Sequence, residues 1–168
     1  MYEYEIRKVT AAIRATRSCL EPAPPLLFRR RILDRNTHRV YQSLILARDV
    51  TLTVNDAGIH TGAALSAIIA AGNALARPLG HPLVTRELYA AAAERATGTS
   101  VVPTDSYSPD TIELLQSITH LGGSIKTAAE HLAVHRDTPN DLGIALRATT
   151  NFVREFTRSY AALTQPST

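Results

Sequence analysis

The sequence predicts an all-α fold, a compact bundle of about six to seven helices that forms one domain over residues 1–168. Apolar residues recur every three or four positions along most of the chain, and no stretch alternates with a period of two for more than a few residues. Hydrophobic residues make up 45% of the chain and aromatic residues only 5%, which favours closely packed helices. A chain of 168 residues is long enough to bury a core of this kind.

Two basic helices are expected in the first third of the chain, residues 1–52. The first covers about residues 2–20, and its apolar face carries Ile6, Val9, Ile13 and Leu20. The prolines of "EPAPP", residues 21–25, end this helix because proline lacks the N–H that a continuing helix needs. A second helix follows over about residues 26–52, and "VNDAG", residues 54–58, has the composition of a turn.

A helical bundle is expected over residues 57–163, and it begins with a helix of small residues over 59–76. The prolines and glycine of "RPLGHP", residues 77–82, break the chain after it. A fourth helix is predicted over residues 83–98, where a glycine is a typical stop signal. A mobile loop of about residues 99–107 follows.

The next helix has a clear start signal. Ser108 can cap it, and Pro109 suits its first position. Gly122 and Gly123 are expected to stop it, because glycine is common just after the end of a helix. A short helix over about residues 124–134 is predicted to follow.

One segment, "ELLQSITHLGGSIKTAAEHLAVHRDT", residues 113–138, has the rhythm of a helix-turn-helix. Two glycines would end one helix sharply, and two alanines would let the next helix cross it closely. The segment resembles the DNA-binding segment at the C-terminus of PucR-type regulators and, more loosely, Fis-type segments. The residues that carry the resemblance are Leu114, Leu115, Gly122, Gly123, Ser124, Ala128, Ala129, Leu132, Val134, His135, Arg136 and Thr138.

The resemblance implies a helix-turn-helix-like corner over residues 113–147, in which the helix after Thr138 would enter the major groove. That helix is predicted to reach about residue 163, yet it carries one basic residue, Arg147, in its first three turns. Base readout needs Arg, Lys, Asn or Gln near its start, and only Asn140 qualifies. A helical corner that packs without reading DNA is therefore the alternative. Candidate secondary contacts to nucleic acid in this region are Lys126, His135, Arg136, Asn140 and Arg147.

The positive charge of the chain is concentrated in its first third. Residues 1–50 hold ten arginines or lysines against five acidic residues, whereas residues 51–168 hold eight against ten. Sixteen of the eighteen basic residues are arginine, which grips phosphate bidentately and stacks on bases. This distribution favours a polyanionic partner for the N-terminal helices.

The stretch "LLFRRRILDRNTHRVYQ", residues 26–42, places much of this charge on one side of a helix. Arg31, Arg35 and Arg39 recur every four residues, about 6 Å apart along the helix axis, which suits consecutive phosphates. Like charges at this spacing destabilise a helix by a few tenths of a kcal/mol per pair, which a bound polyanion would offset. An acidic protein partner and an ordinary solvated surface are the alternatives. The predicted contacts to a nucleic-acid backbone are Arg29, Arg30, Arg31, Arg35, His38, Arg39 and Gln42.

The histidines of the last third do not make a metal or catalytic motif. His131 and His135 share a helix face, but two ligands do not make a zinc site, which needs three or four. His120 and Asp137 lie near them in sequence without the logic of a catalytic triad. A glycine-rich phosphate loop and a nucleophile elbow are absent. We therefore expect a protein that is not an enzyme and uses neither a cofactor nor a metal.

The single cysteine and the N-terminal sequence bear on where the protein acts. Cys19 has no partner for an internal disulfide, so a reducing cytoplasm is the expected compartment. The first 21 residues lack an uninterrupted apolar stretch, so neither a signal peptide nor a membrane span is expected there. The apolar helix of residues 59–76 is too short and too polar at its ends for a confident span.

Together these features predict a non-catalytic protein that binds RNA or DNA through the phosphate backbone. Its small-residue helices offer faces for packing on other subunits or on copies of itself. In size, helicity and basic helix the chain is similar to the small helical subunit of multi-subunit CRISPR effector complexes, a likeness that implies a ribonucleoprotein role in antiviral defence. A helix-turn-helix transcription regulator and a protein–protein assembly or adaptor subunit are the alternatives.

Overall fold

The computed structural model describes residues 2–21, 29–56, 59, 61–84, 109–135 and 139–164. Within these residues the chain forms five helices and no strand, so the all-α prediction is confirmed. The helices are α1 Glu3–Ser18, α2 Arg29–Asp56, α3 Gly62–Leu79, α5 Pro109–His135 and α6 Pro139–Thr164.

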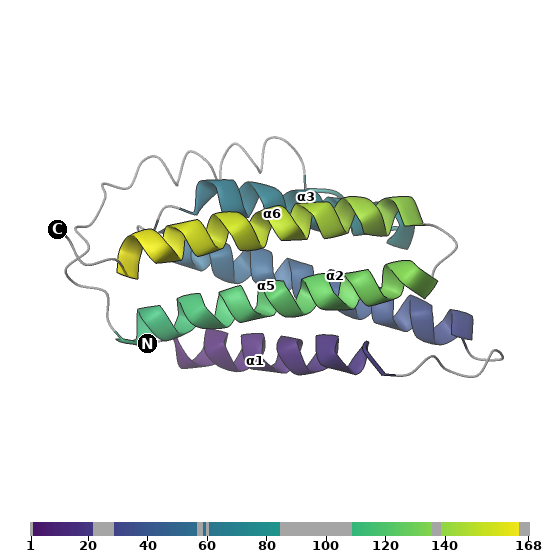
Figure 1. Ribbon diagram of the computed structural model, residues 1–168, viewed down its shortest axis with the longest axis horizontal. Helices are drawn as coiled ribbons and strands as arrows, with labels where there is room; N and C mark the ends of the chain where they lie inside the picture. Colours follow the sequence, from purple (N-terminus) through teal and green to yellow (C-terminus); the bar gives the residue numbers. More distant parts are fainter. Residues whose placement is uncertain are drawn as a thin grey trace.

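Four of these helices form a closed ring. α2 packs on α3, α3 on α6, α6 on α5, and α5 back on α2. Each runs antiparallel to both of its neighbours, as the chain colours in Figure 1 show. Because α3 and α5 therefore run in the same direction, α3 ends and α5 begins at opposite ends of the bundle, and residues 80–108 connect those ends. The topology is that of a four-helix bundle with one long crossover connection.

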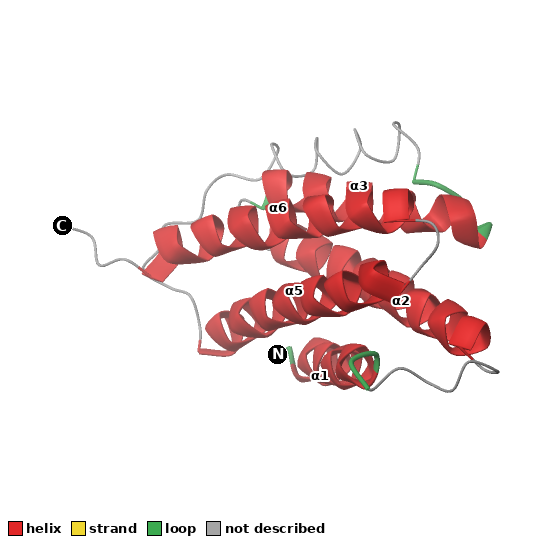
Figure 2. Ribbon diagram, turned by 45° about the vertical axis from the view of Figure 1, so that its right-hand side comes forward, coloured by secondary structure: helices red, strands yellow, loops and turns green. Residues whose placement is uncertain are grey.

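α1 lies outside this ring and packs against α2 and α5. Figure 2 shows it below both helices. Its inner face buries Val9, Ile13 and Thr16. The hydroxyl of Thr16 lies 2.8 Å from the hydroxyl of Ser124 on α5. The ring is thus complete without α1, which is held by a few apolar side chains and a small number of polar contacts.

α5 and α6 pack closely at Gly122. A Cβ atom at this position would lie 2.9 Å from Cγ2 of Val153 and 3.0 Å from Cε1 of Phe152. The ring of Phe152 lies 5.6 Å from that of Phe156, and neither is exposed. At Gly123, by contrast, a Cβ atom would meet nothing within 4 Å. Gly122 therefore leaves the room that α6 needs to approach α5.

The predicted stop at Gly122 and Gly123 is wrong. α5 passes through both glycines without a break, so the short helix expected over residues 124–134 is its second half. The helix-turn-helix-like corner expected over residues 113–147 is not confirmed, because its first turn does not form. A glycine inside a helix costs about 0.5–1 kcal/mol relative to alanine, and the packing of α6 against Gly122 offsets that cost.

The six to seven helices expected are not confirmed, since the described residues form five. Two of the expected helices are one continuous helix, α5. The fourth predicted helix, residues 83–98, falls almost entirely outside the described residues, as do the loop of residues 99–107 and the cap at Ser108. Leu83 and Val84, which are described, are not helical.

α2 and α3 are both longer than predicted. α2 continues to Asp56 through the expected turn, because Val54 and Asn55 are buried. The side-chain oxygen of Asn55 accepts hydrogen bonds of 3.3 Å from both the backbone N–H and the hydroxyl of Thr61, next to the start of α3. α3 continues to its last turn with Pro78 inside it. The break predicted over residues 77–82 therefore begins only after Leu79.

Among the described residues, α3 is the one helix whose length and composition would allow it to span a membrane. It packs on α2 and α6, and its buried side chains include Leu65, Ile68 and Leu75. A core helix of a bundle has the same composition, so the absence of a membrane span stays a prediction.

Candidate nucleic-acid interface

The outward face of α2 carries most of the predicted backbone contacts. The inner face is set by Val40, Leu44 and Ala47, none of which is exposed. The exposed residues among the predicted contacts, here called the arginine stripe, are Arg30, Arg31, Arg35, His38 and Gln42. They extend for about 18 Å along the helix axis, given a rise of about 1.5 Å per residue.

The other two predicted contacts, Arg29 and Arg39, are half-buried. Nη1 of Arg39 donates a hydrogen bond of 2.8 Å to the hydroxyl of Ser18, which ties α2 to the end of α1. Nε of Arg29 is buried and has no hydrogen-bond partner within the part of the chain that the structure describes. Arg29 and Arg39 therefore do not belong to the exposed arginine stripe.

Cys19 lies beside the first half of α2, and the positive charge there affects the pKa of its thiol. The thiol is buried, and its Sγ lies 3.8 Å from the backbone oxygen of Asn36. Burial raises the pKa of the Cys19 thiol, and the positive charges of Arg39 and Arg35 lower it by less. The net effect keeps the thiol protonated and weakly nucleophilic at neutral pH.

Among the described residues, the exposed arginines of the stripe form no ion pair with a carboxylate. Between Arg29 and Gln42 the sequence holds five arginines and a single acid, Asp34. Some exposed cations on other helices do have a carboxylate partner, in the pairs Arg7–Glu3, Lys126–Glu130, Arg154–Glu155 and Arg158–Glu155. Others form no such pair within the described part of the chain, namely Arg14, Arg77 and Arg147. The stripe differs from these single cations because its unpaired arginines are grouped at the start of one helix.

The positive charge of the stripe is concentrated at the N-terminus of α2, where the helix dipole disfavours cations. α2 begins with three consecutive arginines and has no acidic residue in its first turn. The helix dipole makes this end positive, so each cation there is destabilising by roughly 0.3–1 kcal/mol. The positive end of the helix dipole and the exposed guanidinium groups of Arg30 and Arg31 together make the start of α2 strongly positive.

The candidate secondary contacts lie on the other long helices. Lys126 is half-exposed on α5 and pairs with Glu130 at 4.0 Å, and Arg147 is exposed on α6. His135 and Asn140 are helical, but their side chains lie outside the described part, as does all of Arg136. The end of α5 and the start of α6 lie at the same end of the bundle as the start of α2 (Figure 1).

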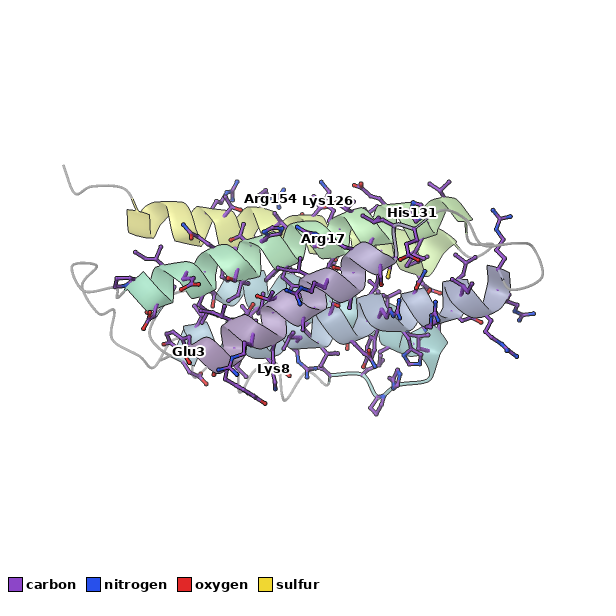
Figure 3. The ribbon with its side chains drawn as sticks, turned by 90° about the horizontal axis from the view of Figure 1, so that it is seen from below. Glu3, Lys8, Arg17, Lys126, His131 and Arg154 are labelled. Atoms are coloured by element: carbon purple, nitrogen blue, oxygen red, sulfur yellow. The ribbon has the colours of Figure 1, made fainter. Side chains whose placement is uncertain are left out.

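Two further cations on α1 were missed by the sequence interpretation. Arg17 lies at the opposite end of α1 from Glu3 and Lys8 (Figure 3). Its Nη2 lies 3.2 Å from Nε2 of His120 on α5. Arg14, one turn earlier, is exposed. The apolar period of α1 already placed these arginines on its outer face, but only the fold brings Arg17 beside His120 of α5.

A cluster of three rings beside the stripe was also missed. His38 lies edge-on to His81, with 5.1 Å between ring centroids. His81 in turn stacks on Tyr41 at 4.7 Å with the ring planes nearly parallel. No sequence pattern links these residues, because His81 follows α3 whereas the other two belong to α2.

Two of the histidines considered for metal binding or catalysis, His120 and His131, have side chains that the structure describes. Among the described residues, no group of three or more His, Cys, Asp or Glu side chains could hold a metal ion. His120 faces Arg17 of α1, and His131 is half-buried on α5. Asp137 lies outside the described residues. The expected absence of enzyme activity stays a prediction.

No family model, no curated protein and no solved structure matches the chain. The resemblance of residues 113–138 to helix-turn-helix segments therefore stays a prediction, as does the likeness to a CRISPR small subunit. Function has to be inferred from the side chains of the chain itself.

Proposed function

We propose that the protein is a non-catalytic nucleic-acid-binding protein that grips the phosphate backbone through the arginine stripe. The observation that carries this proposal is the run of exposed arginines at the start of α2, which lack carboxylate partners among the described residues. Arginine matches the geometry of phosphate with two parallel hydrogen bonds, so adjacent turns of the helix can hold adjacent phosphates.

The energetic cost of this arrangement supports a ligand. Three cations in the first turn oppose the helix dipole by roughly 1–3 kcal/mol in total. The pair Arg31 and Arg35, one turn apart, adds a few tenths of a kcal/mol. Such a sum is a sizeable part of the roughly 5–15 kcal/mol by which a domain is stable. A bound polyanion would offset these repulsions, because each arginine would gain an attraction to a phosphate.

Backbone gripping is favoured over base reading. The stripe lies on the exposed side of a helix within the bundle, and Arg31 and Arg35 are one turn apart on it. The segment that resembles a helix-turn-helix is continuous through Gly122 and Gly123, so the first turn of such a motif is missing. We therefore favour a sequence-independent binder over a transcription regulator.

Partners other than nucleic acid are also part of the proposal. Val134 near the end of α5 is 79% exposed, and Ile144 near the start of α6 is 45% exposed. Apolar side chains at this end of the bundle suit a contact with other subunits or with another copy of the chain. This arrangement is compatible with a small helical subunit of a CRISPR-type ribonucleoprotein complex in the cytoplasm.

The test compares two triple variants with equal changes in charge. The first, Arg30→Gln/Arg31→Gln/Arg35→Gln, neutralises the stripe. The control neutralises exposed arginines beside carboxylates and is Arg7→Gln/Arg154→Gln/Arg158→Gln. Affinity for labelled RNA and DNA strands is measured by fluorescence anisotropy over a range of salt concentrations.

We expect the stripe variant to lose at least about a hundredfold in affinity, because three charge-assisted hydrogen bonds are removed. The slope of log K against log salt should shrink by about 0.7 for each phosphate of a single strand that the variant no longer binds. The control should keep both affinity and slope close to those of the native protein. Equal losses in the two variants would show that net charge, and not the stripe, drives binding.

A further inference from the structure

His38 places a ring in the middle of the arginine stripe. It is exposed, and it lies about one helical turn from Arg35 on one side and from Gln42 on the other. Guanidinium groups and an aromatic ring therefore share one line of the helix surface.

The ring of His38 contacts that of His81 in a T-shaped arrangement, with 5.1 Å between centroids and 71° between the ring planes. His81 also stacks on Tyr41, at 4.7 Å and 4°. Tyr41 and His81 are half-buried, and His38 is the one exposed ring of these three.

The backbone after α3 fixes the position of His81. Gly80 adopts a left-handed conformation with φ of 73°, which a residue with a side chain rarely adopts. Its N–H donates to the backbone oxygen of Arg77 at 3.3 Å, and the N–H of His81 donates to that of Ala76 at 2.9 Å. This pair of bonds is the Schellman motif, which ends a helix in one defined geometry.

A second anchor lies three residues further along. The side-chain oxygen of Asn73 accepts a hydrogen bond of 2.9 Å from the N–H of Val84, and its amide nitrogen donates to the oxygen of Val84 at 3.3 Å. The segment from Gly80 to Val84 is thus tied to α3 at both ends. Nε2 of His81 is buried without a hydrogen-bond partner within the described residues, so ring packing positions its imidazole.

A cationic line with a pre-positioned ring is the pattern of single-strand binding sites, in which arginines follow the backbone and rings stack on bases. In a duplex the faces of the bases are covered by their neighbours and cannot reach a ring on a helix surface. We propose that the ligand of the arginine stripe is single-stranded nucleic acid and that one of its bases stacks on His38. This inference rests on the proposed function and adds base contact to it.

The test uses three labelled ligands of equal length, namely oligothymidylate, an abasic strand with the same phosphates, and a duplex. Fluorescence anisotropy with the full chain should show oligothymidylate binding at least about fivefold more tightly than the abasic strand, as expected for one stacked base. The His38→Ala variant should lose that advantage and bind both strands equally. The His38→Phe variant, which keeps a ring, should retain it.

A matched control removes a ring outside the stripe. Tyr4 on α1 is 65% exposed, and the Tyr4→Ala variant should bind all three ligands as the native chain does. Thermal unfolding checks that each variant is folded, which is expected because His38 and Tyr4 are both exposed.

Equal affinity of the native protein for oligothymidylate and the abasic strand would overturn the stacking proposal and leave backbone gripping intact. A preference for the duplex would also overturn it. Failure to bind any of the three ligands, together with binding to an acidic polypeptide such as polyglutamate, would overturn the proposed function as well.

Discussion

The first half of α2 and the second half of α6 both present arginines to solvent, but they arrange them in opposite ways. On α6, Arg154 and Arg158 flank Glu155 at 3.5 and 3.3 Å. On α2, Arg31 and Arg35 are one turn apart and form no ion pair with a carboxylate among the described residues. The first half of α2 exposes three arginines, whereas the two arginines of α6 share one carboxylate. The arrangement of the arginines therefore distinguishes a candidate binding surface from a solvated one.

Reversing charge on the two helices should give the largest difference. Arg31→Glu/Arg35→Glu is expected to weaken binding to single-stranded nucleic acid by more than about a hundredfold, because two attractions become repulsions. Arg154→Glu/Arg158→Glu makes the same change in net charge and should alter affinity by only a small factor. Anisotropy titrations at one salt concentration provide the comparison. A large loss with the α6 variant would break the distinction between the two helices.

The position of the arginines of α6 depends on how closely α6 packs on α5. In Gly122→Ala the new methyl group would lie 2.9 Å from Val153, and we expect a loss of about 1–2 kcal/mol in the free energy of unfolding. The neighbouring Gly123→Ala has open space and should gain about 0.5–1 kcal/mol. Urea unfolding followed by circular dichroism measures both. Similar effects at the two positions would argue against the packing described for Gly122.

Neutralising the stripe should stabilise the free protein. In Arg30→Gln/Arg31→Gln/Arg35→Gln the repulsion with the helix dipole is removed, and we expect a gain of about 1 kcal/mol or more in the free energy of unfolding. The α6 variant Arg154→Gln/Arg158→Gln loses its pairs with Glu155 and should be destabilised by about 0.5 kcal/mol. No gain in stability for the stripe variant in urea unfolding would mean that the stripe carries no energetic cost.

Replacing Glu155, the acid that pairs with both arginines of α6, should have the smallest effect on nucleic-acid affinity. Glu155→Gln frees Arg154 and Arg158 from their carboxylate and should change affinity for nucleic acid by less than about twofold, since an exposed pair is worth at most about 1 kcal/mol. The same titration is used. A new, strong binding site on this variant would show that unpaired arginines alone suffice, without the ring and the line of cations on α2.

Helix positions followed closely from the sequence, because the burial of each helix face requires apolar residues at a period near 3.6. The continuity of α5 did not follow. Whether Gly122 stops a helix or receives a neighbouring one depends on Val153 and Phe152, which lie about thirty residues further along the chain. A local rule for glycine has no access to that contact.

The candidate site was predictable to the same extent. Periodicity placed five residues on one side of α2, namely Arg31, Arg35, His38, Arg39 and Gln42. The structure exposes all of them except Arg39, which is half-buried. The bond between Arg39 and Ser18 could not be foreseen, since it depends on how α1 docks. The stack of His81 on Tyr41 likewise requires the backbone turn after α3.

Ultraviolet cross-linking of the full chain to a labelled single strand, followed by mass spectrometry of the peptides, tests the central claim most directly. We predict adducts within residues 29–42, with His38 among the modified positions, and their disappearance in the Arg30→Gln/Arg31→Gln/Arg35→Gln variant. Adducts confined to residues 126–147 would place the interface on α5 and α6 and contradict the assignment to the arginine stripe.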